Sequence, residues 1–199
     1  MKFFGDTLVI GRKAIIADLH LGLIRFYDRR LIEKAVKVAE HAQTVIVAGD
    51  LRHLGKPSSF EDFIREVGGI AELILLRGNH DAGIEARKGL RIGKYGIFHG
   101  HAVPNDDVMA AKHLIFAHAH PSIFIADDVG GHKERVFLVG EADVGGEIKR
   151  ITVLPAFNDL CASTAVNLER PSGFMFRRCD YTRWRAVLLD GTVLSLDSL

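Results

Sequence analysis

Short apolar runs alternate with helical patterns over the first 120 residues of the chain. Such runs are typical of strands that are buried on both faces of a sheet. The expected strands are 14–17, 45–48, 73–76, 96–98 and 114–117. Segment 30–41 has apolar residues at helical spacing, and segment 58–67 begins with a capping-box pattern, Ser58 to Glu61, ahead of an apolar face. Alternation of strands and helices predicts an α/β layered fold.

The pattern becomes mostly β after residue 120. The dipeptide Asp190-Gly191 is a strong signal for a two-residue hairpin. We therefore expect a two-sheet core flanked by helices, organised as one domain over residues 1–199. The strands expected in this half are 123–126, 135–139, 148–154, 174–178, 186–189 and 192–196.

The composition is that of a soluble globular protein, with 48% apolar and 26% charged residues. No apolar run approaches the roughly 18 to 20 residues of a membrane span, and the N-terminus lacks the architecture of a signal peptide. We therefore expect a cytoplasmic protein that does not enter a membrane. The net charge of +1 gives no support for a protein that mainly grips nucleic acid, although a local basic patch stays open.

Polar side chains follow each expected strand of the first half. The carboxyl ends of strands in an α/β sheet form one rim where ligands bind, so we expect these side chains to converge. Divalent metals such as manganese, iron, zinc and nickel accept mixed oxygen and imidazole ligands. In an extended segment, residues i and i+2 point to the same side, so Asp18 and His20 can reach one metal together. The candidate ligands are Asp18, His20, Asp50, Asn79, His99, His118 and His120.

The order of these motifs, D-x-H, G-D, G-N-H-D, H-G-H and H-x-H, resembles the calcineurin-like metallophosphoesterase superfamily. The motifs cover residues 15–121, and the resemblance implies a two-sheet β-sandwich with helices outside. Residues 120–121 and 154–158 also resemble a small archaeal group of uncharacterised phosphoesterases related to the SbcD repair nucleases. The chain departs from the family at Ala117, where glycine is usual. Alanine fits there if the backbone does not need a positive φ.

The resemblance implies a role for each matching residue. It assigns three ligands to metal one alone, namely Asp18, His20 and His120. It assigns three others to metal two alone, namely Asn79, His99 and His118, with Asp50 shared between the metals. His80 is implied as the general acid and His53 as a second active-site histidine. His101, two residues after His99, stays open as an alternative ligand.

The implied activity is hydrolysis of a phosphate ester, and we expect a phosphodiester, by a hydroxide that two divalent metals activate. Manganese is our first expectation, with iron, nickel or zinc as alternatives. Arg77 and Arg52 lie next to the ligand turns and are candidates to contact phosphate oxygens, although such arginines also hold surface loops. The expected partner is a phosphate-ester substrate, which can include a nucleotide or a nucleic acid. The sequence does not indicate an oligomeric state.

Two other functions stay open: a DNA or RNA nuclease of the repair branch, and a metal-binding scaffold without catalysis. The chain length argues against a separate DNA-capping domain, and His80 with the complete ligand set argues against the scaffold. Segment 174–185 mixes arginine with aromatic residues, as in a nucleic-acid surface or in two strands around a turn. We expect Cys161 and Cys179 to be free thiols that pack as small apolar residues outside the metal constellation.

Overall fold

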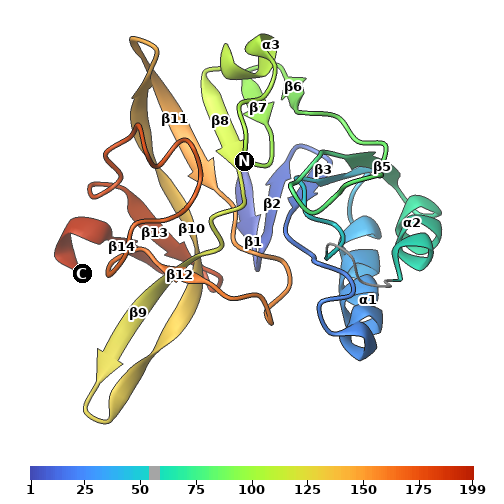
Figure 1. Cartoon of the computed structure of the whole chain (residues 1–199), viewed down its shortest axis with the longest axis horizontal. Helices are drawn as coiled ribbons and strands as arrows, with labels where there is room; N and C mark the ends of the chain where they lie inside the picture. Colours follow the sequence, from blue (N-terminus) through green and yellow to red (C-terminus); the bar gives the residue numbers. More distant parts are fainter. Residues whose placement is uncertain (54–58) are drawn as a thin grey trace.

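The computed structural model describes residues 1–53 and 59–199, and it contains two β-sheets with helices outside the first (Figure 1). The first sheet has the strand order β1-β2-β3-β4-β5. Strands β3, β4 and β5 are parallel, as expected for apolar runs buried on both faces, whereas β1 and β2 are antiparallel neighbours. The bounds are β1 (Lys2–Phe4), β2 (Thr7–Ile10), β3 (Lys13–Ile16), β4 (Thr44–Val47) and β5 (Glu72–Leu75).

Two amphipathic helices cover one face of the first sheet. Helix α1 (Asp28–Ala39), preceded by the 3₁₀ turn η1 (Arg25–Tyr27), packs against β4, and helix α2 (Phe60–Gly68) packs against β5. Both match the expected helices within two residues, but the capping-box residue Ser58 lies outside the described residues. None of the helices in residues 1–53 and 59–199 is long and apolar enough to span a membrane.

The second sheet has the order β12-β9-β10-β11-β8-β7-β6, and β13 and β14 join it through β10. Strand β10 is long and has different neighbours along its length. Its first part pairs with β9, and its second part pairs with β11 and β13. In Figure 1 the β9–β10 hairpin projects from the body of the molecule. The bounds are β6 (Leu90–Ile92), β7 (Tyr95–Ile97), β8 (His113–Phe116), β9 (Pro121–Asp127), β10 (Gly130–Val144), β11 (Glu147–Val153), β12 (Thr164–Ala165), β13 (Arg185–Leu188) and β14 (Val193–Ser195).

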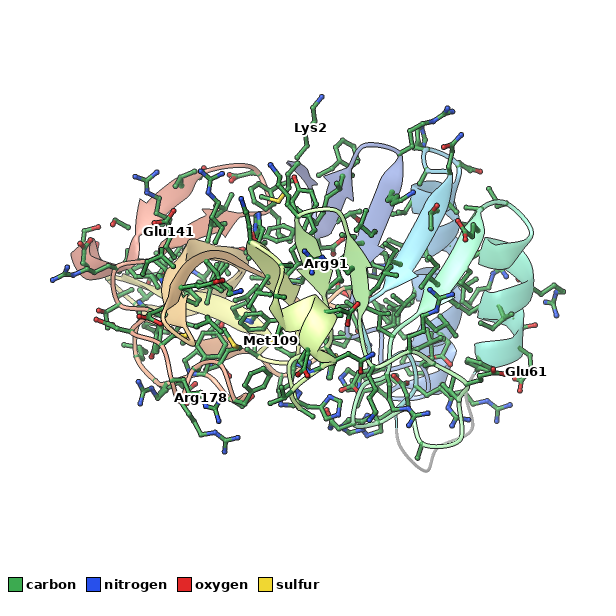
Figure 2. All side chains as sticks on the ribbon, turned by 90° about the horizontal axis from the view of Figure 1, so that it is seen from above. Lys2, Glu61, Arg91, Met109, Glu141 and Arg178 are labelled. Atoms are coloured by element: carbon green, nitrogen blue, oxygen red, sulfur yellow. The ribbon has the colours of Figure 1, made fainter. Side chains whose placement is uncertain are left out.

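The two sheets pack against each other through a continuous apolar layer. Ile15 and Ile46 of the first sheet share one buried cluster with Ile97, Ile115 and Phe137 of the second. Figure 2 shows side chains filling the space between the sheets. The expected α/β fold with a two-sheet core and flanking helices is therefore confirmed.

The outer face of the second sheet is covered differently from the expectation. Segment 174–178, expected to be a strand, forms a series of turns. Its residues Phe174 and Phe176 are buried against Phe98 and Phe116 of the second sheet. Their aromatic character reflects burial on the face of a sheet, not membership of that sheet. The short helix α3 (Asp106–Met109) and the 3₁₀ turn η2 (Leu196–Ser198) complete the described elements.

Candidate metal centre

Five strand ends converge on one site. Strands β3, β4 and β5 of the first sheet lead into the segments that carry Asp18, Asp50 and Asn79. Strands β7 and β8 of the second sheet lead into those that carry His99 and His118. The side chains meet across the sheets, because Oδ1 of Asp18 lies 3.7 Å from Nδ1 of His99. The packing of two sheets thus brings together residues that lie far apart in the chain.

Five of the candidate ligands adopt left-handed backbone conformations, and no other non-glycine residue in the described part of the chain does. Such conformations cost about 1–3 kcal/mol each and persist where the surrounding structure imposes them. The extended path that we expected from Asp18 to His20 is therefore wrong, although these two side chains do converge. The residues and φ values are Asp18 (56°), His20 (46°), Asp50 (51°), His118 (70°) and His120 (42°).

Ala117 is accommodated where the family usually has glycine. Its φ is not positive, and its N–H donates to the carbonyl oxygen of His99 at 2.8 Å. The backbone therefore makes no demand for glycine at this position.

The glycines before Asp50 and Asn79 have different reasons to be glycine. Gly49 has a φ of 97°, as expected for a sharp turn, and a Cβ atom there would also overlap the imidazole of His99. Gly78 does not have a positive φ, so a sharp turn that only glycine can make does not explain it. A Cβ atom on Gly78 would overlap Oδ1 and the backbone nitrogen of Asp50. Close packing against the Asp50 carboxylate is therefore its reason.

Gly78→Ala is expected to lower both thermal stability and metal content. Forcing a methyl group into a filled site costs about 1–3 kcal/mol, and here the displaced group is a candidate metal ligand. Gly68→Ala is the matched control, because a Cβ atom on Gly68 meets no described atom within 4 Å. Replacing a helical glycine by alanine stabilises by about 0.5–1 kcal/mol. Thermal unfolding and metal analysis of both variants test this, and equal metal loading would contradict it.

Several buried ligand atoms have no hydrogen-bond partner among the described residues. Asp18 is fully buried, and its Oδ1 accepts no hydrogen bond from the described residues. His20 is 5% exposed, and neither ring nitrogen has a hydrogen-bond partner among residues 1–53 and 59–199. Buried polar atoms are nearly always satisfied, so these atoms call for a ligand that is not part of the chain.

The hydrogen bond of His99 orients it as a metal ligand. Its Nδ1 donates to the carbonyl oxygen of Ala48 at 2.9 Å, as is usual for metal-binding histidines. In the neutral ring, Nε2 then carries a lone pair, which faces Oδ2 of Asp50 at 3.3 Å and Oδ1 of Asn79 at 3.2 Å. Three electron-rich atoms facing one another are stabilised by a cation between them.

His120 has the same arrangement on the other side of the site. Its Nδ1 donates to the carbonyl oxygen of Ala162 at 2.9 Å, and Nε2 lies 3.4 Å from Oδ1 of Asp18. The potential ligand atoms of Asp18, His20 and Asp50 lie within 4.8 Å of one another. Nitrogen and oxygen donors of this kind fit a divalent metal.

Asp50 belongs to both halves of the site. A carboxylate oxygen of Asp50 lies within 4.8 Å of ligand atoms of Asp18 and His20. A carboxylate oxygen also lies within 4.8 Å of ligand atoms of His99 and His118. One atom, Oδ2, lies 3.3 Å from Nε2 of His99 and 3.5 Å from Nε2 of His20. Burial would raise the pKa of Asp50, but in the metal-free protein a hydrogen bond from the protonated ring of His99 outweighs burial and keeps the carboxylate ionised. The donor set therefore fits two metal ions that share one carboxylate.

The affinity of the metal-free protein for metal is expected to rise with pH. Burial opposes a charge on His120, but the Asp18 carboxylate raises its pKa to about 9. At neutral pH His120 therefore carries a proton that a metal must displace. Apparent affinity at this half of the site should rise about tenfold per pH unit and level off above about pH 9. Competition with a chelating dye from about pH 7 to about pH 10 measures this, and a flat profile would contradict it.

The two predicted catalytic histidines lie together beside His20. The imidazole rings of His53 and His80 stack with their centroids 5.2 Å apart. The His80 ring lies 4.9 Å from that of His20, and its backbone N–H donates to Oδ1 of Asp50 at 2.9 Å. Both side chains are half-buried, so they lie at the rim of the site, where a substrate can reach them.

The two predicted phosphate-binding arginines differ in their surroundings. The guanidinium of Arg52 donates to the carbonyl oxygen of Ala82 at 2.6 Å and lies over the Phe60 ring at 5.6 Å. These contacts favour the alternative in which Arg52 holds a loop. Arg77 is exposed, and its backbone N–H donates to the carbonyl oxygen of Arg87 at 2.8 Å.

Two buried residues that brace the ligand loops were not assigned roles from the sequence. Asp81 accepts hydrogen bonds from the backbone N–H groups of Gly78 at 2.9 Å and Arg52 at 3.2 Å. The side-chain amide of Asn158 donates to the carbonyl oxygen of Leu19 at 2.9 Å. Both stand within the quoted motifs, at the end of G-N-H-D and of segment 154–158, which is the signal that could have identified them.

His101 and the turn segment after Gly173 border the second half of the site. The His101 ring lies 5.2 Å from that of His99, so the alternative ligand is close by. Gly173 packs against His118, because a Cβ atom on it would lie 3.6 Å from Cδ2 of that imidazole. The exposed Arg178 on this segment is labelled in Figure 2.

Cys161 lies inside the metal constellation, so the expectation that both thiols lie outside it is wrong for this residue. Its Sγ is within 4.8 Å of the ligand atoms of His20 and His120. Burial and the carboxylates of Asp18 and Asp50 raise the pKa of the Cys161 thiol to about 12. Cys179 is a free thiol in the apolar core, as expected.

A family model described as calcineurin-like phosphoesterase matches residues 11–136, a span that contains every candidate ligand. No curated protein matches the chain.

The chain is similar to several solved structures. Nuclease MPE from Pseudomonas putida is 18% identical, with 92% of this chain and 87% of that chain covered and a TM-score of 0.63. A single mutant of Vps29 from Entamoeba histolytica is 16% identical, with 92% and 95% covered and a TM-score of 0.46. A predicted phosphoesterase from Streptococcus pneumoniae is 15% identical, with 93% and 89% covered and a TM-score of 0.39. At these identities the likeness concerns the fold alone.

Proposed function

We propose, from the premise that the chain belongs to the calcineurin-like phosphoesterase family, that it hydrolyses a phosphodiester at a centre of two divalent metal ions. The observation that supports this most is that Asp18 and His20 carry buried ligand atoms with no hydrogen-bond partner among the described residues, at the place where the ends of five strands meet. Manganese is the first choice for the metals, with iron, nickel and zinc open. The nitrogen and oxygen donors described above suit each of these ions.

The ligands divide into two groups around Asp50. Asp18, His20 and His120 would hold one ion. Asn79, His99 and His118 would hold the other. When bound, the two ions would neutralise charge on the phosphate and lower the pKa of the attacking water.

The remaining steps belong to side chains at the rim. His80 is placed to protonate the leaving oxygen, since its ring borders His20 while its backbone is fixed to Asp50. His53 stacks on His80 and would keep that ring in place. Arg77 is exposed beside the Asn79 turn and would contact a phosphate oxygen.

Hydrolysis of two model substrates by manganese-loaded protein tests the proposal. We expect turnover of bis-p-nitrophenyl phosphate and little turnover of p-nitrophenyl phosphate. Turnover of the monoester alone would contradict the diester assignment while leaving a phosphoesterase. Turnover of neither, with metal bound, would favour the non-catalytic scaffold.

Assays with cyclic nucleotides, dinucleotides and single-stranded DNA test which class of phosphodiester is the substrate. Cleavage of DNA in preference to the small diesters would favour the nuclease alternative and the proposed closeness to the archaeal relatives of the SbcD nucleases. Cleavage of the small diesters alone would favour a nucleotide phosphodiesterase. A location in the cytoplasm is part of the proposal.

A further inference from the structure

The two halves of the proposed metal centre differ in one ligand type. Sγ of Cys161 lies within 4.8 Å of ligand atoms of His20 and His120, on the side of metal one. The group on the other side consists of Asp50, His99 and His118, and no described thiol joins it. The centre is therefore asymmetric in the softness of its donors.

The loop after β11 brings the thiol to this place and holds it there. The Phe157 N–H donates to the carbonyl oxygen of Ala17 at 2.8 Å, which ties the loop to the end of β3. The Cys161 N–H then donates to the carbonyl oxygen of Asn158 at 3.2 Å, and Sγ lies 3.9 Å from the carbonyl oxygen of Asp18. These backbone hydrogen bonds therefore hold the Cys161 thiol beside the end of β3.

The same loop also orients a candidate ligand of metal one. The carbonyl oxygen of Ala162, the residue after Cys161, accepts the hydrogen bond from Nδ1 of His120. The loop that carries Cys161 thus also accepts the hydrogen bond that aims Nε2 of His120 at Asp18.

A second observation points to a ligand at this place. His20 is 5% exposed, and both its ring nitrogens lack a hydrogen-bond partner within the described ranges. One of them faces the same point as Sγ of Cys161 and a nitrogen of His120. A buried imidazole without a partner, beside a thiol and a second imidazole, is the donor set of a borderline-soft metal.

We propose that Cys161 supplies a thiolate ligand to the metal held by Asp18, His20 and His120, and that this ligand makes metal one thiophilic. The inference rests on the proposed metal centre and adds a residue to it. Thiolate donors favour zinc and cobalt over manganese, whereas metal two keeps only nitrogen and oxygen donors. On coordination the thiol gives its proton to the solvent. The expected centre therefore takes two different metals when both kinds are present.

Cobalt(II) spectroscopy of the full-length protein tests the ligand directly. Wild type, Cys161→Ser and the matched control Cys179→Ser are loaded with cobalt after removal of other metals. We expect visible ligand-field bands in all three proteins. A thiolate-to-cobalt charge-transfer band in the near ultraviolet should appear in wild type and Cys179→Ser, and it should be absent in Cys161→Ser.

Competition between zinc and manganese gives an independent readout. The preference of the first site for zinc should fall by about tenfold or more in Cys161→Ser and stay unchanged in Cys179→Ser. Equal preference in wild type and Cys161→Ser would overturn the proposal.

The outcomes separate this inference from the metal centre on which it rests. Ligand-field bands without a charge-transfer band in wild type would overturn the role of Cys161 alone, even if the serine variant failed to fold. Absence of bound cobalt in wild type would overturn the metal centre and this inference with it. Neither readout depends on turnover, so an inactive protein still answers the question.

Discussion

Asp50→Asn is expected to release both metal ions and to abolish turnover. A single oxygen of this carboxylate lies 3.3 Å from Nε2 of His99 and 3.5 Å from Nε2 of His20. Its negative charge would therefore face both proposed metal positions and offset the repulsion between two cations. Loss of a group that merely supports a ligand weakens metal binding about 10- to 100-fold, so loss of a shared ligand should weaken it more.

His20→Asn provides the comparison that isolates the shared role. His20 faces Asp18 and Asp50 but takes no part in the group of Asp50, His99 and His118. We expect this variant to lose one metal and keep the other. Metal analysis after saturation with manganese measures both outcomes. Two metals per chain in Asp50→Asn would refute the bridging role.

The strands and their polar ends could be predicted because their signals are local. The short run 45–48 indicates a buried strand because it is rich in β-branched residues and is followed by a glycine, and Asp50 comes directly after that glycine. Parallel pairing of neighbouring strands then places several carboxyl ends at one edge. The candidate ligands could therefore be located as the polar residues that follow these strands.

Other features could not be predicted because they depend on packing between distant segments. Cys161 reaches His20 only because its loop is tied to the end of β3, and no spacing in the sequence encodes this contact. Segment 174–178 has the aromatic composition of a strand but is buried as turns against the second sheet. The left-handed conformations of Asp18 and His118 likewise arise from the folded site, since positive φ is uncommon for any non-glycine residue and no local motif predicts it here.

His80→Ala is expected to keep both metals and lose most turnover. His80 contacts the Asp50 carboxylate through its backbone N–H, which donates to Oδ1 at 2.9 Å. Alanine retains that N–H, so the carboxylate should stay in place. The imidazole, which borders the ring of His20, is removed. A positioned proton donor contributes about 10²- to 10⁴-fold to the rate.

The defect should depend on the leaving group if His80 is the general acid. p-Nitrophenolate leaves readily without a proton, so the loss with bis-p-nitrophenyl phosphate should be near the low end of that range. A nucleoside or alkyl leaving group needs the proton, so the loss with a dinucleotide should be largest. The ratio of turnover rates for the two substrates, in wild type and variant, measures this dependence.

A purely supporting role for His80 predicts a different pattern. If the ring only braces the turn around Asn79, its loss should weaken metal binding and slow every substrate by the same factor. His132→Ala is a suitable control, because His132 lies in the projecting β9–β10 hairpin beside Glu134, outside the cluster of candidate ligands. Metal content and the two-substrate ratio together distinguish the roles. Reduced metal binding with a uniform defect would exclude His80 as the acid, whereas full metal content with an unequal defect leaves proton donation as the explanation.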